Sequence, residues 1–286
     1  MSPLPWGFYL PAYRAHGRNA SSVLKGSADA RHRQRSPHTS AAVAADSPAE
    51  AARQADLVIT MLSDAAALRE VVEGPQGILA GATASTTLAE MSTVGPPAVR
   101  RLAAMLPDGV GLLDAPVLGS VSEAESGSLR IFVGGPEQLA QQWMPVLGAL
   151  GSPTHVGPLG AGAAAKLVAN STLFGVLAVL GEALALADRL GLPRDTAFEV
   201  LSATPVGSQA DRRRPAIESG QFPLRFALSL ARKDADLVVS AAESAGVELP
   251  VATAARQWVA SAQEAGLGDQ DYSAVIAHIT DTARSA

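Results

Sequence analysis

A lysine and an asparagine stand four residues apart in a stretch that is otherwise almost wholly apolar. The stretch is GPLGAGAAAKLVANSTLFG, residues 157–175, and the two side chains belong to Lys166 and Asn170. If the stretch is helical, this spacing places both side chains on one face. Burial and the positive end of the helix would lower the pKa of Lys166, as a general acid or base requires, and Asn170 could hold a substrate oxygen beside it. Spacing alone slightly favours a structural interpretation, in which the lysine extends to solvent from a helix end.

Three short loops of small residues follow apolar runs that are typical of buried strands. They are MLSD (61–64), MSTVGPP (91–97) and APVLGS (115–120). Ligands bind at the carboxyl ends of parallel strands, so together these loops predict a crevice along one edge of a sheet. The GPLGAG segment has the order G-x-x-G-x-G and no strand after its helix, so we interpret it as a close-packed helix start rather than a dinucleotide fingerprint. Lys233 and Asp234 are expected on a solvated helix face, and DRRRP (211–215) is expected to be a surface turn.

The elements that must position these residues change character halfway along the chain. Strands alternate with helices of about ten residues, which predicts a doubly wound parallel sheet of the α/β class. The predicted strands are 56–62, 86–92, 110–117 and 129–135. After residue 157 every pattern is helical, at about 160–190, 193–203, 226–246, 251–265 and 271–283. We therefore expect two domains, 1–158 and an all-α domain at 159–286.

Composition excludes several kinds of site and partner. There is no cysteine, which excludes disulfides and thiolate chemistry, and the five histidines have no metal-ligand spacing, so no metal site is expected. The formal net charge of −5 gives no general attraction to nucleic acid or to an anionic membrane. The charge-free apolar run 167–181 is shorter than the roughly 20 residues of a membrane span, and no secretory signal opens the chain. A cytoplasmic protein is expected.

The motifs, in their order and spacing, resemble the β-hydroxyacid dehydrogenase family, which includes 3-hydroxyisobutyrate dehydrogenase and glyoxylate or succinic-semialdehyde reductases and shares the fold type of 6-phosphogluconate dehydrogenase. The resemblance covers about residues 35–283 and rests on the segments DAPVLGS, SGSLRIFVGG, HVGPLGAGAAAKLVAN, FALSLARKDADL, ADLVITML, EMSTVGP and GLGDQDYSAVI. It implies a Rossmann-type domain that binds NADP or NAD, followed by a helical substrate and dimerisation domain. It also implies a small-molecule substrate and a homodimer or homotetramer.

The resemblance assigns roles to individual residues. Lys166 matches the lysine that exchanges the hydroxyl proton while hydride moves between nicotinamide C4 and the carbinol carbon, and Asn170 matches the asparagine that orients the substrate. Residues implied to bind the cofactor are Arg35, Met61, Leu62, Thr93 and Lys233. Residues implied to bind the substrate, with Asn170, are Leu118, Gly119 and Ser120.

Two departures from the family pattern leave alternatives open. The substrate loop reads Leu118-Gly119-Ser120 where the family usually has Ser-Gly-Gly. Residues 1–34 contain no G-x-G-x-x-G, and residues 1–45 carry six Lys or Arg against one acid. We hypothesise a reading-frame error upstream of about residue 35. The alternatives to a hydroxyacid dehydrogenase are an imine reductase-like enzyme, or a binding-only relative that lacks the phosphate-binding loop.

Overall fold

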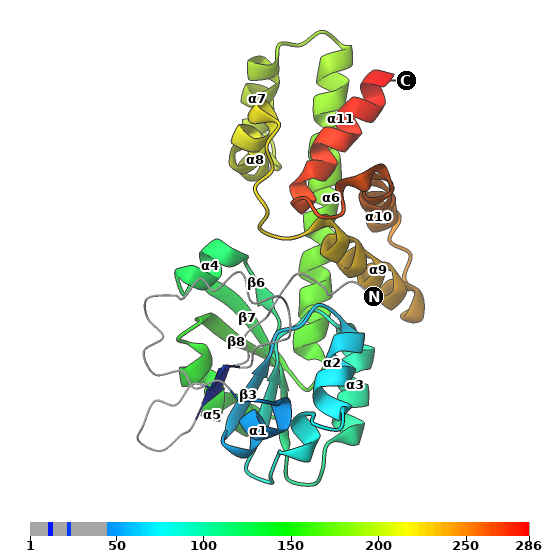
Figure 1. The fold of residues 1–286 in the computed structure, drawn as a ribbon. Coiled ribbons are helices and arrows are strands. Elements are labelled where there is room, and N and C mark those ends of the chain that lie inside the picture. Colours follow the sequence, from blue (N-terminus) through cyan, green and yellow to red (C-terminus); the bar gives the residue numbers. More distant parts are fainter. Residues whose placement is uncertain (1–10, 14–21, 24–44, 286) are drawn as a thin grey trace. The chain divides into compact units, whose positions relative to one another are not determined.

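The computed structural model describes residues 11–13, 22–23 and 45–285 (Figure 1). The chain divides into two compact units, residues 1–166 and 167–286. The dividing point lies inside one long helix, whereas the domain boundary expected from the sequence, 158/159, lies just before that helix. The helix therefore contributes its first turns to one unit and the remainder to the other.

The first unit begins with alternating helices and strands whose limits follow the sequence closely. Helix α1 starts after Ser47, whose side chain accepts a hydrogen bond from the Glu50 backbone N–H. The strands β3 and β4 are buried along their whole length, as strands covered on both faces must be. The elements are α1 (Pro48–Arg53), β3 (Leu57–Thr60), α2 (Ala65–Glu73), the 3₁₀ turn Ile78–Ala80, β4 (Thr87–Glu90), α3 (Gly95–Met105) and β5 (Gly111–Asp114).

The second part of this unit adds β6 (Val117–Leu118), α4 (Val121–Glu125), β7 (Leu129–Gly134), α5 (Glu137–Leu147) and β8 (Gly151–Gly157). Strands β3, β4 and β5 are parallel to one another, and so are β7 and β8. Strand β7 runs antiparallel to β5 and β6. The predicted strand 110–117 is thus two strands, because the chain turns at Ala115 and Pro116 to pair with β7 instead of continuing along β4.

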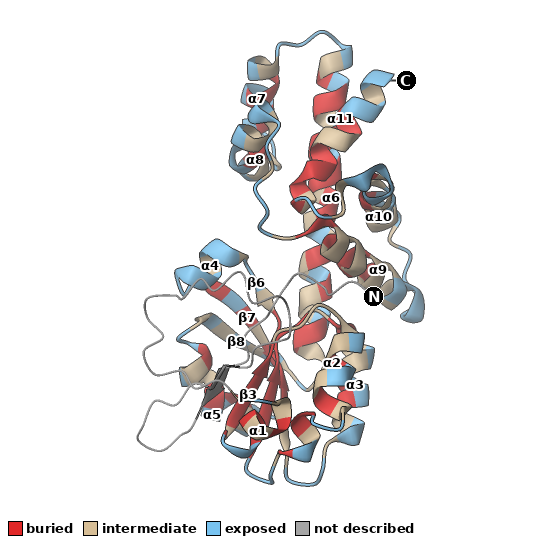
Figure 2. Ribbon diagram, viewed as in Figure 1, coloured by how far each residue is buried: buried red, intermediate tan, exposed pale blue. Residues whose placement is uncertain are grey.

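The sheet carries an apolar core on each face. Val58, Leu88 and Leu112 pack with α1, α2 and α3, while Leu57, Ala89 and Leu113 pack with α5 on the opposite face. Figure 1 shows α2 and α3 on one side of the sheet and α5 on the other, and Figure 2 shows the strands between them as buried. The predicted α/β fold with a parallel sheet at its centre is confirmed. Antiparallel pairs flank that centre, and one is made by β1 (Pro11–Tyr13), which pairs with β2 (Ser22–Val23) and β3.

The second unit is helical, as predicted. Its elements are α6 (Ala161–Arg189), α7 (Arg194–Ser202), α8 (Gly207–Ser219), α9 (Leu228–Ser244), α10 (Pro250–Ala262), the π-helical turn Gln263–Leu267, the 3₁₀ turn Tyr272–Ala274 and α11 (Val275–Ser285). Phe174, Leu177 and Leu184 of α6 are in the core of the unit with Phe198 and Ile276. In the part of the chain that the structure describes, one helix, α6, has the length and apolar composition that could cross a membrane. However, half of its most apolar window is buried in the protein. That burial is typical of the central helix of a bundle.

Helix α8 corrects the prediction of a surface turn at DRRRP, which lies inside this helix. Arg213 is only 6% exposed; it donates a hydrogen bond to the Tyr272 hydroxyl, and its guanidinium carbon lies 4.9 Å from the centre of that ring. Its Nη1 is 3.9 Å from Asp271 Oδ1. A buried arginine is stable where it has such partners, and these are far away in the sequence. No local pattern predicts them.

Candidate active site

Three polar residues end three neighbouring parallel strands at the same level. Thr60, Glu90 and Asp114 are in register on β3, β4 and β5, and each is at most 1% exposed. The Thr60 hydroxyl donates a hydrogen bond to Glu90 Oε2, and the Ser92 backbone N–H donates to Glu90 Oε1 over 2.7 Å. Ser92 Oγ in turn accepts from the Leu62 backbone N–H over 2.8 Å. The loops after β3 and β4 are therefore tied to each other and to the buried carboxylate of Glu90.

This edge contains three of the residues that the sequence implicates in cofactor binding. Met61, Leu62 and Thr93 are partly exposed, whereas Met91 and Ser92 beneath them are buried. Helix α3, which follows Thr93, starts without a side-chain cap on its N–H groups. Apolar side chains and a hydroxyl on a fixed frame suit the apolar face and the polar edge of a nicotinamide ring. The residues present fit that half of a dinucleotide.

The diphosphate half has no such counterpart in the described residues. Strand β8 and helix α6 form a strand–turn–helix around GPLGAG, the layout of a phosphate cradle. However, Asp114 occupies the start of α6, because its Oδ1 accepts from the Gly160 N–H over 2.8 Å and its Oδ2 from the Ala163 N–H over 2.6 Å. A carboxylate of the chain itself fills the anion site. Arg35 and the proposed frame error at residues 1–34 lie outside the described residues, apart from β1 and β2.

Gly162 of this segment and Gly134 at the end of β7 allow the close packing that the sequence predicts for the start of the helix. A Cβ at Gly162 would stand 2.3 Å from the carbonyl oxygen of Phe132 and 2.4 Å from that of Asp114. A Cβ at Gly134 would be 2.4 Å from Asp114 Oδ1. The first turn of α6 thus lies directly on β5 and β7, with the Asp114 carboxylate enclosed between them. Burial raises the pKa of Asp114, although the backbone N–H groups of Gly160 and Ala163 act in the opposite direction.

Lys166 lies in the second turn of α6, three residues after Ala163, and is partly buried. Asn170 follows one turn later on the same face and is 2% exposed. Its Nδ2 donates a hydrogen bond to Asp234 Oδ2 on α9 over 2.9 Å, and Asp234 Oδ1 is 2.7 Å from Lys233 Nζ. Residues 170, 233 and 234 are thus brought together within the helical unit.

Asp234 is a site residue that the sequence reasoning missed. We expected Lys233 and Asp234 on a solvated face, but Asp234 is 3% exposed. It shares the buried face of α9 with Ala231, Ala235 and Val238. The signal was present in the spacing, because positions i, i+3, i+4 and i+7 of a helix face the core, and a carboxylate among them needs a partner.

The predicted substrate loop is held by its own local bonds. Leu118 is exposed at the end of β6, and Gly119 has φ +136°, with Leu129 Cδ2 only 2.8 Å from where a Cβ would lie. The backbone N–H and hydroxyl of Ser120 both donate to Glu123 Oε2, over 2.8 and 2.9 Å. These bonds lower the pKa of Glu123 to about 2, with the Ser120 N–H as the largest cause. The Ser120 hydroxyl therefore keeps only its acceptor capacity for a ligand.

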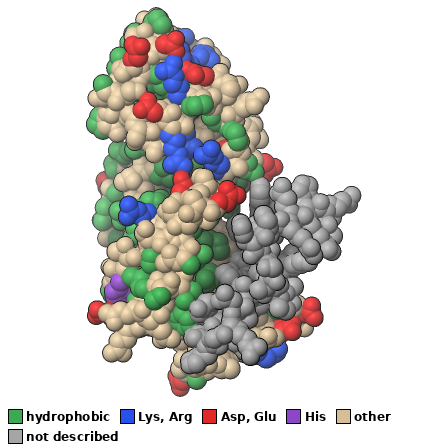
Figure 3. All heavy atoms as spheres, turned by 90° about the vertical axis from the view of Figure 1, so that its left-hand side faces the viewer, with side chains coloured by type: hydrophobic (Ala, Val, Ile, Leu, Met, Phe, Trp, Pro, Cys, Tyr) green, Lys and Arg blue, Asp and Glu red, His purple; other side chains and the backbone are tan. Residues whose placement is uncertain are grey.

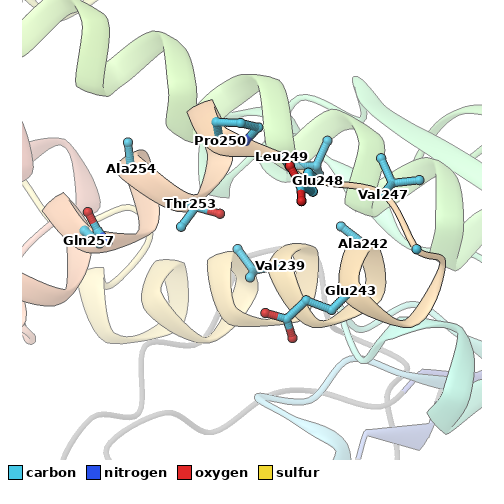
Figure 4. A pocket seen from close by; sticks show the side chains of 11 residues that line it. Val239, Ala242, Glu243, Val247, Glu248, Leu249, Pro250, Thr253, Ala254 and Gln257 are labelled. Carbon is cyan, nitrogen blue, oxygen red and sulfur yellow. The ribbon is translucent and has the colours of Figure 1, made fainter.

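The groove that the structure shows elsewhere in the described residues is lined by none of the predicted site residues. A groove of about 710 Å³ lies between the end of α9 and the start of α10, lined by residues such as Val239, Glu243, Leu249, Thr253 and Gln257 (Figure 4). On the face drawn in Figure 3, basic and acidic side chains are interspersed and neither forms a continuous patch. Within residues 45–285 no group of three or more His, Asp or Glu side chains could hold a metal ion.

Comparison with known proteins identifies both units. Residues 18–160 match the model of the NAD binding domain of 6-phosphogluconate dehydrogenase, and residues 160–279 match the model described as NAD-binding of NADP-dependent 3-hydroxyisobutyrate dehydrogenase. The chain is 35% identical over 239 residues to 2-(hydroxymethyl)glutarate dehydrogenase of Eubacterium barkeri, covering 82% of this chain and 79% of the relative. It is 32% identical over 234 residues to glyoxylate/succinic semialdehyde reductase 1 of Arabidopsis thaliana, covering 81% of each.

A solved structure gives the same result. The crystal structure of 3-hydroxyisobutyrate dehydrogenase from Salmonella typhimurium superposes with a TM-score of 0.73 at 30% identity, over 82% of this chain and 83% of that one. The α/β unit followed by a helical unit agrees with the two matches along the chain. The chain belongs to the β-hydroxyacid dehydrogenase family of NAD(P)-dependent oxidoreductases.

Proposed function

We propose that this protein transfers a hydride between NADP or NAD and a small β-hydroxyacid or its semialdehyde, with Lys166 as the general acid and base. The observation that carries the proposal is the position of Lys166. It is in the second turn of a helix whose first N–H groups are bound by Asp114, at the same sheet edge as Met61, Leu62 and Thr93. The relatives named above act on compounds with a carbonyl or hydroxyl group near a carboxylate, which supports the substrate class.

The chain's own residues supply position and a proton. The cofactor, when bound, supplies or receives the hydride at nicotinamide C4. In the reducing direction, Lys166 Nζ donates its proton to the carbonyl oxygen as the carbon receives the hydride, so the product is the neutral alcohol and the lysine is left as an amine. In the oxidising direction the same nitrogen accepts the hydroxyl proton. Asn170, oriented by Asp234, holds the substrate beside the amine. Leu118, Gly119 and Ser120 are proposed to bind the substrate as well, because the resemblance implies it.

The finer features of the proposal follow from the resemblance and from exposed residues. Arg35 favours NADP over NAD, because a guanidinium can pair with the 2′-phosphate. A cytoplasmic homodimer or homotetramer is proposed, with an apolar stripe on α6 as the contact. Val168, Val179 and Leu186 are 68%, 46% and 60% exposed, and their spacings of 11 and 7 residues place them on one side of the helix.

Steady-state kinetics with a substrate panel test the proposed reaction. The panel contains 3-hydroxyisobutyrate, succinic semialdehyde, glyoxylate and a cyclic imine, each with NADPH or NADP and with NADH or NAD. We expect turnover of a carboxylated substrate, and loss of that turnover in Lys166→Ala with NADPH affinity changed by only a few-fold. Arg189→Ala removes a cation from the last turn of the same helix and should leave the rates unchanged. An active Lys166→Ala enzyme would exclude the proton-transfer role, and turnover of the imine alone would favour an imine reductase.

A second candidate is a binding-only relative, and two observations support it. No G-x-G-x-x-G occurs in residues 1–34, and β1 pairs with β3 in the antiparallel direction. Both features remove the usual pyrophosphate cradle. Titration with NADPH, followed by its fluorescence, separates the candidates: an enzyme must bind the dinucleotide at concentrations that support turnover.

A further inference from the structure

The buried carboxylates of Glu90 and Asp114, at the ends of β4 and β5, form hydrogen bonds to two different parts of the chain. Glu90 bonds to Thr60 at the end of β3 and to Ser92 in the loop after β4, and Ser92 Oγ accepts from the Leu62 N–H in the loop after β3. Asp114, its neighbour in register, bonds instead to the start of α6. Two carboxylates side by side in the interior of a sheet are unusual, because burying an acid is unfavourable unless the group is paired or hydrogen-bonded. Glu90 accepts a backbone N–H from the loop after β4, and Asp114 accepts two from the start of α6.

We propose that Asp114 is a positioning residue that sets the place of Lys166, and that Glu90 is the corresponding positioning residue of the two cofactor loops. The proposal rests on the function proposed above, since it concerns the same site. Neither carboxylate is assigned a contact with substrate or cofactor. Each acts through the segment that it holds.

The geometry around Asp114 leaves the start of α6 little freedom. Its two carboxylate oxygens each hold one N–H of the first turn, and these donors are three residues apart. Gly162, between them, has backbone oxygens of β5 and β7 within 2.4 Å of a would-be Cβ. A helix held at its first turn on two sides has a fixed axis, so the side chain one turn further, at Lys166, leaves the backbone at a fixed point. A proton donor needs this precision, because a displacement of about 1 Å can reduce a rate by about a hundredfold.

The geometry around Glu90 differs in one chemically useful way. One of its donors is a backbone N–H, from Ser92, which can only donate. Another is the Thr60 hydroxyl, which can also accept. A glutamine at position 90 can therefore keep its oxygen toward Ser92 and direct its amide toward Thr60. An asparagine at position 114 has no such solution, since the partners of the two Asp114 oxygens, Gly160 and Ala163, are backbone N–H groups and one of them must face the amide nitrogen.

The difference between the donors of Glu90 and those of Asp114 allows matched variants at the two positions to be compared. Asp114→Asn is expected to reduce kcat by about tenfold or more while the NADPH dissociation constant stays within about threefold of the wild type. Glu90→Ala is expected to raise the NADPH dissociation constant by about tenfold or more, with kcat at saturating cofactor within about threefold. Glu90→Gln should restore affinity to near the wild-type value. Each variant thus serves as the control for the other, because both remove a buried carboxylate from the same sheet edge.

Three measurements decide the matter: NADPH titration by fluorescence, steady-state kinetics on the substrate that the panel identifies, and amide hydrogen exchange of the cofactor-free protein. In the exchange experiment Gly160 and Ala163 should lose protection in Asp114→Asn, and Leu62 and Ser92 in Glu90→Ala. If Asp114→Asn does not fold, Asp114→Glu keeps both acceptors but displaces them by one methylene, and should reduce kcat with retained folding. Equal changes of kcat and affinity in both variants, or unchanged kcat in a folded Asp114 variant, would overturn the proposal. A wild-type chain that binds no NADPH or turns over no substrate would instead refute the proposed function.

Discussion

The side-chain amide of Asn170 donates a hydrogen bond to the carboxylate of Asp234 over 2.9 Å, although the two residues are 64 positions apart. Both are buried, at 2% and 3% exposure. Because a carboxylate only accepts, the Asn170 nitrogen must face Asp234 and its oxygen must face the other way. Helix α9 therefore sets the orientation of a side chain on α6, one turn from Lys166.

Removing or inverting this pair should affect stability in a graded way. Asn170→Ala leaves Asp234 Oδ2 without its amide donor and should reduce the free energy of unfolding by about 1–3 kcal/mol. Asn170→Asp opposes two buried carboxylates and should destabilise further. The double variant Asn170→Asp with Asp234→Asn restores an amide–carboxylate pair in the opposite direction. Urea denaturation of all variants should show partial recovery in the double variant, and no recovery would argue against a specific pair.

Gly162→Ala is expected to be strongly unfavourable, because its Cβ would collide with backbone oxygens of Phe132 and Asp114 that cannot move independently. Overpacking of this kind costs roughly 1–3 kcal/mol or more. Gly175→Ala, on the same helix, is the matched control, since the nearest atom to its Cβ would be Val251 Cγ1 at 3.4 Å. It should be neutral or stabilise by up to about 1 kcal/mol through helix propensity. Thermal unfolding of both variants measures the difference, and similar melting temperatures would contradict it.

The substrate loop should lose stability in acid. The folded-state pKa of Glu123 is lowered to about 2, below its ordinary value of 4.5, so its bonds to Ser120 stabilise the protein above about pH 4.5 and are lost as the pH falls toward 2. Glu123→Gln cannot titrate and should remove this part of the pH dependence. The free energy of unfolding of both proteins, measured from pH 7 down to pH 3, should converge as the pH falls. A constant difference would show that the carboxylate charge is unimportant.

Dinucleotide affinity should be weak for this chain. No glycine fingerprint cradles the diphosphate, and Asp114 fills the helix start that most resembles one. The dissociation constants of this chain for NADPH and for NADH should therefore both exceed the lower of the two values measured for the Eubacterium barkeri relative in the same buffer. If resequencing of the gene finds an upstream frame with a fingerprint, the restored chain should bind more tightly. An intact frame that encodes the same 34 residues would refute the frame-error hypothesis.

Oligomerisation should depend on the apolar stripe of α6. Leu186→Asp places a charge at the C-terminal end of the proposed contact and should shift the protein toward monomer in light scattering coupled to size exclusion. Val247→Asp changes a residue that is 52% exposed and lies outside the stripe, so it should leave the mass unchanged. A wild-type monomer at micromolar concentration would contradict the proposed assembly.

Local patterns predicted most elements because the signals are local. The apolar run at 56–62 is visible within a few residues, and the structure has β3, Leu57–Thr60, inside it. Helix α8 was missed because its sequence is polar and its stability depends on Arg213 contacting Tyr272, far along the chain. The split of 110–117 into two strands depends on pairing with β7, which is likewise a distant partner.

The sequence by itself determined the family, the alternation that builds the sheet edge, and the spacing that places Lys166 and Asn170 on one face of a helix. It could do so because helix periodicity and strand alternation are properties of short segments. Only the tertiary structure decided which groups hold these segments: Glu90 the ends of β3 and β4, Asp114 the start of α6 and Asp234 the side chain of Asn170. A buried carboxylate is stable only with donors, and the fold, not the neighbouring sequence, brings those donors within reach.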